Sequence, residues 1–370
     1  MKKEKVNEKN LDFSMLITIL VLLCMGIVMV STASSYHALS MYGNSNYLLT
    51  RQLIFAVAGV IAMLVISRID YKIYRRWSYL GYIVALLLLI AVLTPLGVEV
   101  NGAKRWLGIG LFKFQPSEIM KIALVLATAT YISLHIKKMN TLRSYFVPAL
   151  FILAVVVVMF LQKHMSGTLV MMVASASIIF ASGLKIKTRY IVAIILVGII
   201  ALGAFIASEP FRIKRILAFA NPEEDIRGDN WQAAQSLYAI GSGGIFGRGL
   251  GQSRQKYLWL PEAQNDFIFS VLGEEFGLAG TVIVLGVFTF FIYRGYRIAI
   301  TCKDLYGSLI ATGITSVFAI QIIVNIAVVT CSMPVTGMPL PFFSYGGTAL
   351  FINLCAMGIL LSISRNCKNE

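Results

Sequence analysis

Residues 13–34 read FSMLITILVLLCMGIVMVSTAS and contain no charged side chain. A helix needs about 20 consecutive apolar residues to cross the hydrocarbon core of a bilayer, so this run is long enough to span a membrane. The basic tail before the run would also fit a secretory signal peptide, but the apolar core of such a peptide has only about 7–15 residues. We therefore predict an uncleaved first span.

Similar apolar runs recur along the whole chain. They predict nine further spans, at 52–67, 77–97, 115–136, 144–162, 167–184, 190–207, 266–293, 305–330 and 344–364. Of the 370 residues, 58% are hydrophobic and 13% are charged, whereas soluble proteins carry about 25% charged residues. The sequence therefore predicts an all-α polytopic membrane protein of about ten transmembrane helices, organised as a single integral membrane domain over 1–370.

The net charge of +15 could indicate a nucleic-acid-binding protein. Its distribution argues against that interpretation, because most of the excess lies in the tail at 1–12 and in alternate short segments, at 68–76, 137–143, 185–189, 294–303 and 365–368. Lys and Arg accumulate in the cytoplasmic loops of membrane proteins. We therefore predict that both termini are cytoplasmic, that the longest loop, 208–265, is external, and that no nucleic acid binds.

The five cysteines are Cys24, Cys302, Cys331, Cys355 and Cys367. They are scattered over both predicted sides and within spans. Their spacing predicts neither a disulfide framework nor a zinc site.

The external loop between the seventh and eighth spans carries alternating charge and a glycine-rich run. Residues 231–238 form an amphipathic helical pattern, and residues 241–251 read GSGGIFGRGLG. The run lacks the GK[ST] ending of a nucleotide loop, so it forms either tight turns or a backbone that approaches a ligand closely. Basic side chains flank it and could bind either phosphate or lipid headgroups: Arg212, Lys214, Arg215, Arg248 and Lys256.

Asp266 lies at the outer edge of the eighth span. A carboxylate at a membrane boundary is partly desolvated, which raises its pKa and suits it to general-base catalysis. The alternative role is that of a helix N-cap, for which Asp is favoured. The two roles are compatible.

Charged residues also occur within or beside other spans. Glu118 and Lys121 share one face of the fourth span, and they are either functional groups in a cavity or an internal ion pair. Glu274 and Glu275 fall in the eighth span, and at least one of them must face a cavity or a partner. Arg51 begins the second span, where it either reaches the headgroups or lines the same cavity.

Two further external segments have distinctive compositions. Residues 101–116, NGAKRWLGIGLFKFQP, mix aromatic, aliphatic and basic side chains, which predicts a segment lying in the membrane interface or an entry path for a lipid headgroup. Residues 334–348, PVTGMPLPFFSYGGT, contain three prolines. We expect this segment to be rigid and non-helical as far as about Ser344, and to line a cavity.

Residues 334–348, preceded by Asn325, closely resemble the defining motif of the SEDS family, which includes RodA, FtsW and SpoVE. A second block, Asn101–Lys121, and a third, Trp231–Phe267, resemble the family too, so that the resemblance covers nearly the whole chain. The details are more similar to FtsW and SpoVE than to RodA.

The resemblance implies a peptidoglycan glycosyltransferase that polymerises lipid II at the outer face of the bacterial cytoplasmic membrane, in cell division or sporulation. Asp266 matches the essential aspartate of the family, and Glu118 and Lys121 match its charged pair in the fourth span. The family works with a class B penicillin-binding protein, a separate transpeptidase. Asp266 would be the catalytic base, and a divalent cation (Mg or Mn) bound by it is allowed by the sequence but not required.

One block departs from the family pattern. The family has Gln-Pro-Asp-Leu-Gly-Thr at the turn between the fifth and sixth spans, whereas residues 162–168 read QKHMSGT. We interpret His164 as an interfacial residue. A lipid II flippase and a non-catalytic scaffold for a penicillin-binding protein are the alternative functions.

Overall fold

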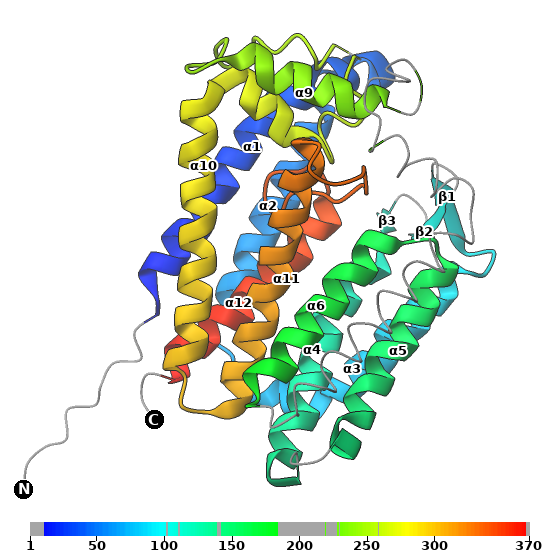
Figure 1. Cartoon of the computed structure of the whole chain (residues 1–370), viewed down its shortest axis with the longest axis vertical. Coiled ribbons are helices and arrows are strands. Elements are labelled where there is room, and N and C mark those ends of the chain that lie inside the picture. Colours follow the sequence, from blue (N-terminus) through cyan, green and yellow to red (C-terminus); the bar gives the residue numbers. More distant parts are fainter. Residues whose placement is uncertain are drawn as a thin grey trace, which may run out of the picture.

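The computed structural model describes residues 11–100, 103–109, 112–138, 142–183, 219, 228, 230–257 and 259–367. This part of the chain is an elongated bundle of helices with a small sheet at one end (Figure 1). The long helices are α1 (Phe13–Tyr42), α2 (Tyr47–Ile66), α3 (Tyr74–Val92), α4 (Pro116–His135), α5 (Phe146–Leu161), α6 (Met165–Ala181), α10 (Ile268–Thr301), α11 (Leu305–Val329) and α12 (Gly347–Asn366).

These nine helices correspond to nine of the ten predicted spans, whereas the predicted span at 190–207 lies outside the described residues. Seven of them are long and apolar enough to cross a membrane, and α5 and α6 are shorter apolar helices. The apolar side chains of Ile54, Val57 and Ile61 are exposed along one side of α2. Spacings of three and four residues place them on one face, as expected for a helix side that contacts lipid.

Three short strands between Gly97 and Phe114 form a small sheet in the segment that was predicted from composition to lie in the membrane interface. Strands β1 (Gly97–Val100), β2 (Ala103–Ile109) and β3 (Phe112–Phe114) are antiparallel and adjacent in that order. Side chains alternate between the two faces of a strand. Leu107 is accordingly buried and Lys104 is exposed, so Arg105 shares the inward face with Leu107.

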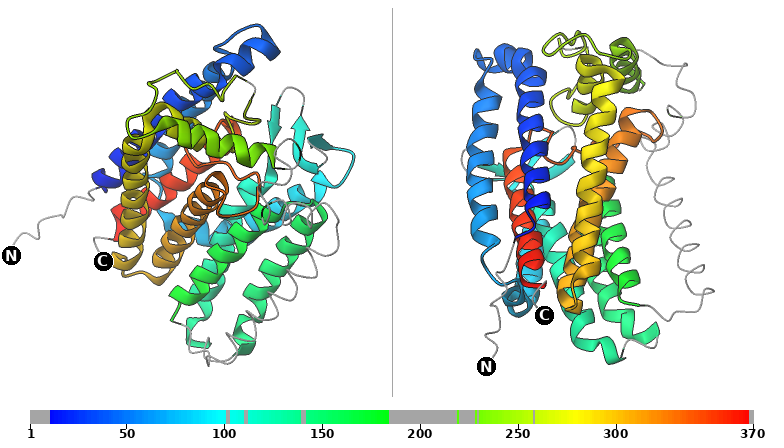
Figure 2. Two further views of the ribbon diagram at one scale, coloured as in Figure 1. Left: turned by 45° about the horizontal axis from the view of Figure 1, so that its top comes forward. Right: turned by 90° about the vertical axis from the view of Figure 1, so that its left-hand side faces the viewer.

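Segments predicted to be cytoplasmic meet at one end of the bundle. Figures 1 and 2 place the start of α1, the end of α12 and the α10–α11 connection together at this end, and the sheet and α9 (Trp231–Gly243) at the other. The hydroxyl of Tyr71, in the short helix η1 (Tyr71–Ile73), donates a hydrogen bond to Asp304 at the same end (2.9 Å). Segments that the charge pattern assigns to one side of the membrane therefore lie at one end of the bundle.

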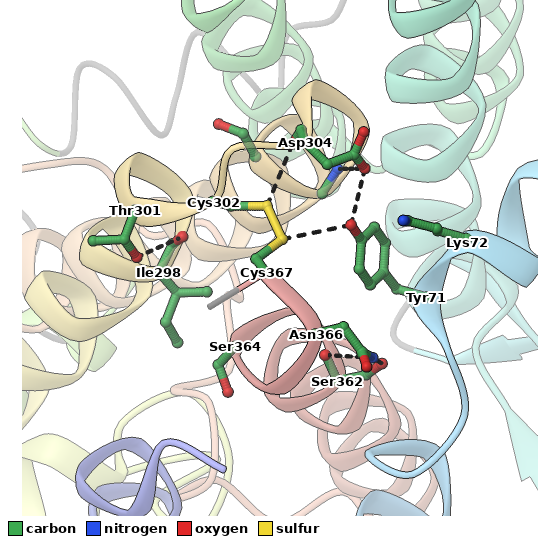
Figure 3. Close-up of a disulfide and its surroundings, with 12 residues drawn as sticks. Tyr71, Lys72, Ile298, Thr301, Cys302, Asp304, Ser362, Ser364, Asn366 and Cys367 are labelled. Atoms are coloured by element: carbon green, nitrogen blue, oxygen red, sulfur yellow. Dashed lines mark hydrogen bonds between the residues drawn. A yellow bond between two sulfur atoms is a disulfide. The ribbon is translucent and has the colours of Figure 1, made fainter. Parts of the chain in front are cut away.

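Two cysteines that are far apart in sequence meet at this end (Figure 3). Cys302 follows α10 and Cys367 follows α12, and the two form a disulfide. The prediction that the cysteines are scattered without a disulfide was wrong for this pair. The spacing along the chain gave no indication of it, because helix packing brings together residues that are 65 positions apart.

Candidate functional site

Asp266 lies in a tight turn immediately before α10. Glu262 begins this turn in the left-handed backbone region (φ 56°), which is uncommon for a residue with a side chain. The carbonyl of Glu262 accepts the N–H of Asn265 (2.9 Å), and its carboxylate accepts the side-chain amide of Asn265 (2.6 Å). The N-cap of α10 is Phe267, and no side chain caps the helix. The alternative role of Asp266 as a helix cap is therefore not observed.

The proline-rich segment 334–346 holds this turn in place. The side-chain amide of Asn325, in α11, donates to the carbonyls of Asp266 (2.8 Å) and Met338 (2.7 Å). The hydroxyl of Ser344 donates to the carbonyl of Asn265 (2.6 Å), and the N–H of Tyr345 donates to the carbonyl of Gln264 (2.9 Å). The backbone around Asp266 is thus fixed from two sides.

Gln52, in α2, in turn fixes the proline-rich segment. Its amide donates to the carbonyl of Ser344 (3.3 Å) and accepts the N–H of Gly346 (3.2 Å), and its side chain is fully buried. The neighbouring Arg51 lies 5.7 Å from the ring centre of Tyr47. Burial raises the pKa of the Tyr345 phenol and the positive charge of Arg51 opposes this shift, so Arg51 lies near the same segment.

The carboxylate of Asp266 is in an unfavourable environment for its negative charge. Burial raises the pKa of Asp266 to about 7, the negative charge of Glu262 adds to this, and Arg105 acts in the opposite direction. No hydrogen bond or ion pair reaches the carboxylate from the part of the chain that the structure describes. A side chain on Gly337 would begin 3.3 Å from Oδ2, so glycine keeps this approach to the carboxylate open.

Arg105 is a site residue that the sequence analysis did not single out. It projects from β2 and donates to the carbonyl of Lys163 in the α5–α6 turn (2.7 Å). Its charge lowers the pKa of both Asp266 and His164. The segment 101–116 looks interfacial in composition, and only the pleat of the sheet turns Arg105 inward.

His164 lies in the same turn and is buried, which contradicts its interpretation as an interfacial residue. Its Nδ1 accepts the N–H of Gly167 (3.0 Å) and so caps the start of α6. The other ring nitrogen, Nε2, lies 2.7 Å from the side-chain amide nitrogen of Gln115. Burial lowers the pKa of His164 to about 3, so the ring is neutral.

Glu118 and Lys121 form an ion pair within α4, with 2.7 Å between Nζ and Oε2 and both side chains largely buried. The internal ion pair considered from the sequence is therefore present. Lys121 also contributes to lowering the pKa of His164, which places the pair next to the α5–α6 turn. Asp266, Arg105, His164 and Lys121 thus form a chain of electrostatic neighbours.

The glycine-rich run approaches protein backbone at a break in α10. Gly277 has non-helical angles (φ 66°, ψ −164°), which interrupts the helix. The N–H groups of Arg248 and Gly249 donate to the carbonyls of Glu274 (3.0 Å) and Glu275 (2.9 Å). Across the break, the N–H of Leu278 donates to the carbonyl of Gly244 (2.9 Å). The glycine-rich run therefore forms turns whose backbone packs closely against the backbone of α10.

Glu274 and Glu275, the acidic pair at this break, form hydrogen bonds and ion pairs with residues of the loop. The carboxylate of Glu274 accepts from the Ser253 hydroxyl (2.6 Å) and the Arg254 N–H (2.9 Å). Lys256 is buried, with its Nζ 3.3 Å from Glu275. Arg248 is partly exposed, 3.7 Å from Glu274. The candidates Arg212, Lys214 and Arg215 lie outside the described residues.

Metal-binding residues are sparse here. Among the described residues, no group of three or more His, Cys, Asp or Glu side chains could hold a metal ion. Asp266 has only Glu262 as an acidic neighbour acting on its pKa. The residues present would fit a cation such as Mg²⁺ only if water and substrate phosphates supplied most of its ligands, as they often do for this ion.

Known proteins with similar sequences and structures cover nearly the whole chain. Residues 13–369 match the family of FtsW, RodA and SpoVE, described as cell cycle proteins. Stage V sporulation protein E of Bacillus subtilis is 44% identical over 96% of this chain and 97% of its own length. A probable peptidoglycan glycosyltransferase FtsW of Trichlorobacter lovleyi is 41% identical over 96% of this chain and 94% of its own length.

Two solved structures share the fold. A chain from a peptidoglycan synthase complex, in a study of the coordination of polymerization and crosslinking, aligns with a TM-score of 0.80 and 27% identity, over 97% of this chain and 99% of that one. The crystal structure of the rod shape determining protein RodA of Thermus thermophilus aligns with a TM-score of 0.71 and 28% identity, over 97% of this chain and 98% of that one.

Proposed function

The chain belongs to the FtsW/RodA/SpoVE family of cell cycle proteins, and we propose that it is a peptidoglycan glycosyltransferase that polymerises lipid II into glycan strands at the outer face of the cytoplasmic membrane, in cell division or sporulation. Its FtsW relatives are named as probable peptidoglycan glycosyltransferases, and a similar chain belongs to a peptidoglycan synthase complex. Membrane helices suit a substrate whose lipid tail stays in the bilayer while its sugars are in water.

The reaction sets two demands on the protein. A sugar hydroxyl of one substrate attacks the anomeric carbon of the other, and undecaprenyl pyrophosphate leaves. A base must accept the hydroxyl proton, and positive charge must stabilise the leaving pyrophosphate. A base works best when its pKa lies near the working pH, because it is then both ionised and basic enough.

The carboxylate of Asp266 is the observation that carries the proposal. It lies on a turn fixed by Asn325 and Ser344, and burial raises its pKa to about 7. The side-chain amide of Asn265 donates to the carboxylate of Glu262 and not to Asp266, whose carboxylate receives no hydrogen bond from the described residues. Asp266 is therefore assigned as the base that accepts the hydroxyl proton.

Arg105 is the cation that we assign to the leaving pyrophosphate, because its charge acts on Asp266 from an anchored position on Lys163. Glu118, Lys121 and Arg51 are assigned to positioning the substrate. Further candidates for phosphate binding are Arg248, Lys256, Arg212, Lys214 and Arg215. Arg248 is the stronger of the two described ones, because Lys256 would first have to leave its buried pair with Glu275.

A divalent cation at Asp266 is part of the proposal only as an addition. When bound, it would supply charge to the pyrophosphate together with Arg105. No step assigned to Asp266 or Arg105 depends on it.

A class B penicillin-binding protein is the proposed partner, since polymerised strands need a transpeptidase to cross-link them. The similar chain in a peptidoglycan synthase complex supports this assignment. Purification from native membranes with a tagged chain would recover the transpeptidase if the two form a stable complex.

The test is a reconstitution with labelled lipid II. Purified protein, with and without its penicillin-binding partner, is given the substrate, and glycan chains are separated on a gel. We expect polymer from the natural chain, none from Asp266→Ala, and undiminished polymer from Glu99→Gln, which alters an exposed acidic side chain in β1. Translocation of the headgroup without polymer would identify a flippase instead. Polymer from folded Asp266→Ala would refute the assigned base.

A further inference from the structure

The inner end of the bundle holds a pair of cysteines that the proposed function does not use. Cys302 directly follows the end of α10 whereas Asp266 precedes its start, so the cysteine pair and the Asp266 turn lie at opposite ends of this helix. Both cysteine side chains are largely buried. Their Cα atoms are 4.9 Å apart. This separation is within the range of about 4.4–6.8 Å found in disulfides, so the backbone already permits the bond.

The surroundings also suit the two separate thiols. The sulfur of Cys302 lies 3.3 Å from the carbonyl of Asp304, and that of Cys367 lies 3.5 Å from the hydroxyl of Tyr71 (Figure 3). Each thiol therefore has a hydrogen-bond acceptor when the disulfide is open, since a thiol is a weak donor. A side chain on Gly307 would begin 2.7 Å from one sulfur and 3.1 Å from the other, so glycine leaves room for both.

The charge of the neighbouring segments indicates which side of the membrane this end faces. Basic residues surround the pair in sequence and across the η1 contact: Arg294, Arg297, Lys303, Arg365, Lys72 and Arg75. Such segments are typically cytoplasmic. Cytoplasmic thiols are kept reduced, and disulfides there are usually transient. A permanent structural cross-link is therefore not what this location favours.

We propose that Cys302 and Cys367 are a reversible redox modification site on the cytoplasmic side, which exchanges with an oxidised low-molecular-weight thiol such as glutathione disulfide. The thiolate of one cysteine attacks a sulfur of the small disulfide, which gives a mixed disulfide and releases one small thiol. The second cysteine then attacks the protein sulfur of the mixed disulfide. The Cys302–Cys367 bond forms, a second small thiol leaves, and the two cysteine protons end on the released thiols.

The bond would connect the α10–α11 turn to the end of α12 and close a loop of 65 positions that contains α11 and α12. These helices carry Asn325 and adjoin the segment that holds the Asp266 turn. The modification is nevertheless independent of the proposed glycosyl transfer, because its chemistry involves only the two sulfurs and the small thiol.

The test counts free thiols in membranes that contain the full chain, which has five cysteines. Inside-out vesicles are held in reduced or oxidised glutathione, unfolded in detergent, and labelled with a maleimide polymer that shifts the gel band once per thiol. We expect two fewer labels after oxidation and full recovery after reduction. Mass spectrometry of unreduced peptides should find residues 302 and 367 joined.

Variants separate this pair from the other cysteines. In Cys302→Ser and in Cys367→Ser, we expect the joined peptide to disappear and the loss to fall to at most one label, as a mixed disulfide with glutathione. In Cys355→Ser, the loss of two labels should persist. Equal labelling in both buffers would overturn the proposal, and so would a pair that stays unlabelled in reduced glutathione. Oxidation that occurs only in right-side-out vesicles would overturn the cytoplasmic placement.

Discussion

At Asp266, burial makes the charged state of the carboxylate costly to the fold. The pKa of Asp266 is raised from 3.8 to about 7, mainly by burial, so the folded state binds the proton more tightly than the unfolded state. Stability is then lost as the pH rises from about 3.8 through about 7. A stability cost of this kind is expected at a residue with the role proposed for Asp266, because perturbed pKa values cluster at functional sites.

We predict that Asp266→Asn abolishes polymerisation and stabilises the fold at pH 8. The gain should be on the order of 1 kcal/mol, well below the full value of the pKa shift, because the side chain is partly exposed. Thermal unfolding of both proteins between pH 5 and pH 9 measures it. The natural chain should lose stability relative to the variant as the pH rises, and parallel curves would contradict the raised pKa.

The pH dependence of the rate tests the link between Asp266 and Arg105. A base must be ionised, so the polymerisation rate should rise with pH and be half-maximal near the pKa of about 7. The positive charge of Arg105 lowers this pKa, so Arg105→Gln should move the midpoint upward. Lys104→Gln is the matched control, because Lys104 is the exposed neighbour in β2. An unchanged midpoint in Arg105→Gln would show that the charge of Arg105 does not act on the pKa of the base.

In the α5–α6 turn, which lacks the aspartate of the family pattern, His164 accepts a hydrogen bond from the first turn of α6. Its Nδ1 caps α6, and its ring is neutral because burial lowers its pKa to about 3. We predict that His164→Ala destabilises the fold by about 0.5–2 kcal/mol, the usual cost of losing an N-cap, and that His164→Asn recovers most of it. Thermal unfolding measures both, and equal losses would show that capping is not the contribution of His164.

At the scale of the secondary-structure element, the break in α10 is a feature that was not predicted from the sequence. A Cβ on Gly277 would lie 2.3 Å from the nitrogen of Gly247, and both residues have positive φ angles. The break exists because the glycine-rich run supplies backbone hydrogen bonds to the interrupted helix. The run of residues 266–293 was expected to be one continuous span, with at least one of its two glutamates facing a cavity or a partner.

A series of alanine substitutions separates the two requirements for glycine. Gly277→Ala meets backbone and has an unfavourable φ, so it should cost more than about 2 kcal/mol. Gly251→Ala has only the unfavourable φ (76°) and should cost about 1 kcal/mol. Gly241→Ala lies in α9 with open space around it and should stabilise by about 0.5–1 kcal/mol. Thermal unfolding gives the order, and a harmless Gly277→Ala would contradict the break.

At the scale of the whole molecule, Gln52 connects α2 to the turn that carries Asp266. Its amide bonds the backbone at Ser344 and Gly346, and Ser344 bonds the turn. We predict that Gln52→Ala costs about 1–3 kcal/mol, since it leaves a buried carbonyl at Ser344 and a partly buried N–H at Gly346 without their partner. It should also lower kcat more than it raises KM. Thr50→Ala, in an exposed part of α2, is the control. If the two variants changed the rate equally, the hydrogen bonds of Gln52 would not be what positions the Asp266 turn.

Most of the fold could be predicted because a bilayer imposes a simple rule on sequence. Apolar length predicted the nine long helices that the structure describes, of which seven are long and apolar enough to cross a membrane, and α4 and α11 end within one or two residues of the predicted bounds. Asp266 and the Glu118–Lys121 pair were identified because charge near or within a span is unusual. Arg105, Gln52 and the buried role of His164 were missed, since polar residues in loops and at helix ends have many ordinary explanations.

The sequence by itself determined the membrane-spanning class, the helix order and the family, because hydropathy and motifs are properties of consecutive residues. Only the tertiary structure decided which polar groups meet. Asp266, Arg105 and His164 come from three separate segments, and the Cys302–Cys367 pair joins the ends of two helices. Such contacts between distant segments depend on the packing angles of helices and on the pleat of a short sheet. Neither can be predicted from the local pattern of hydrophobic and polar residues.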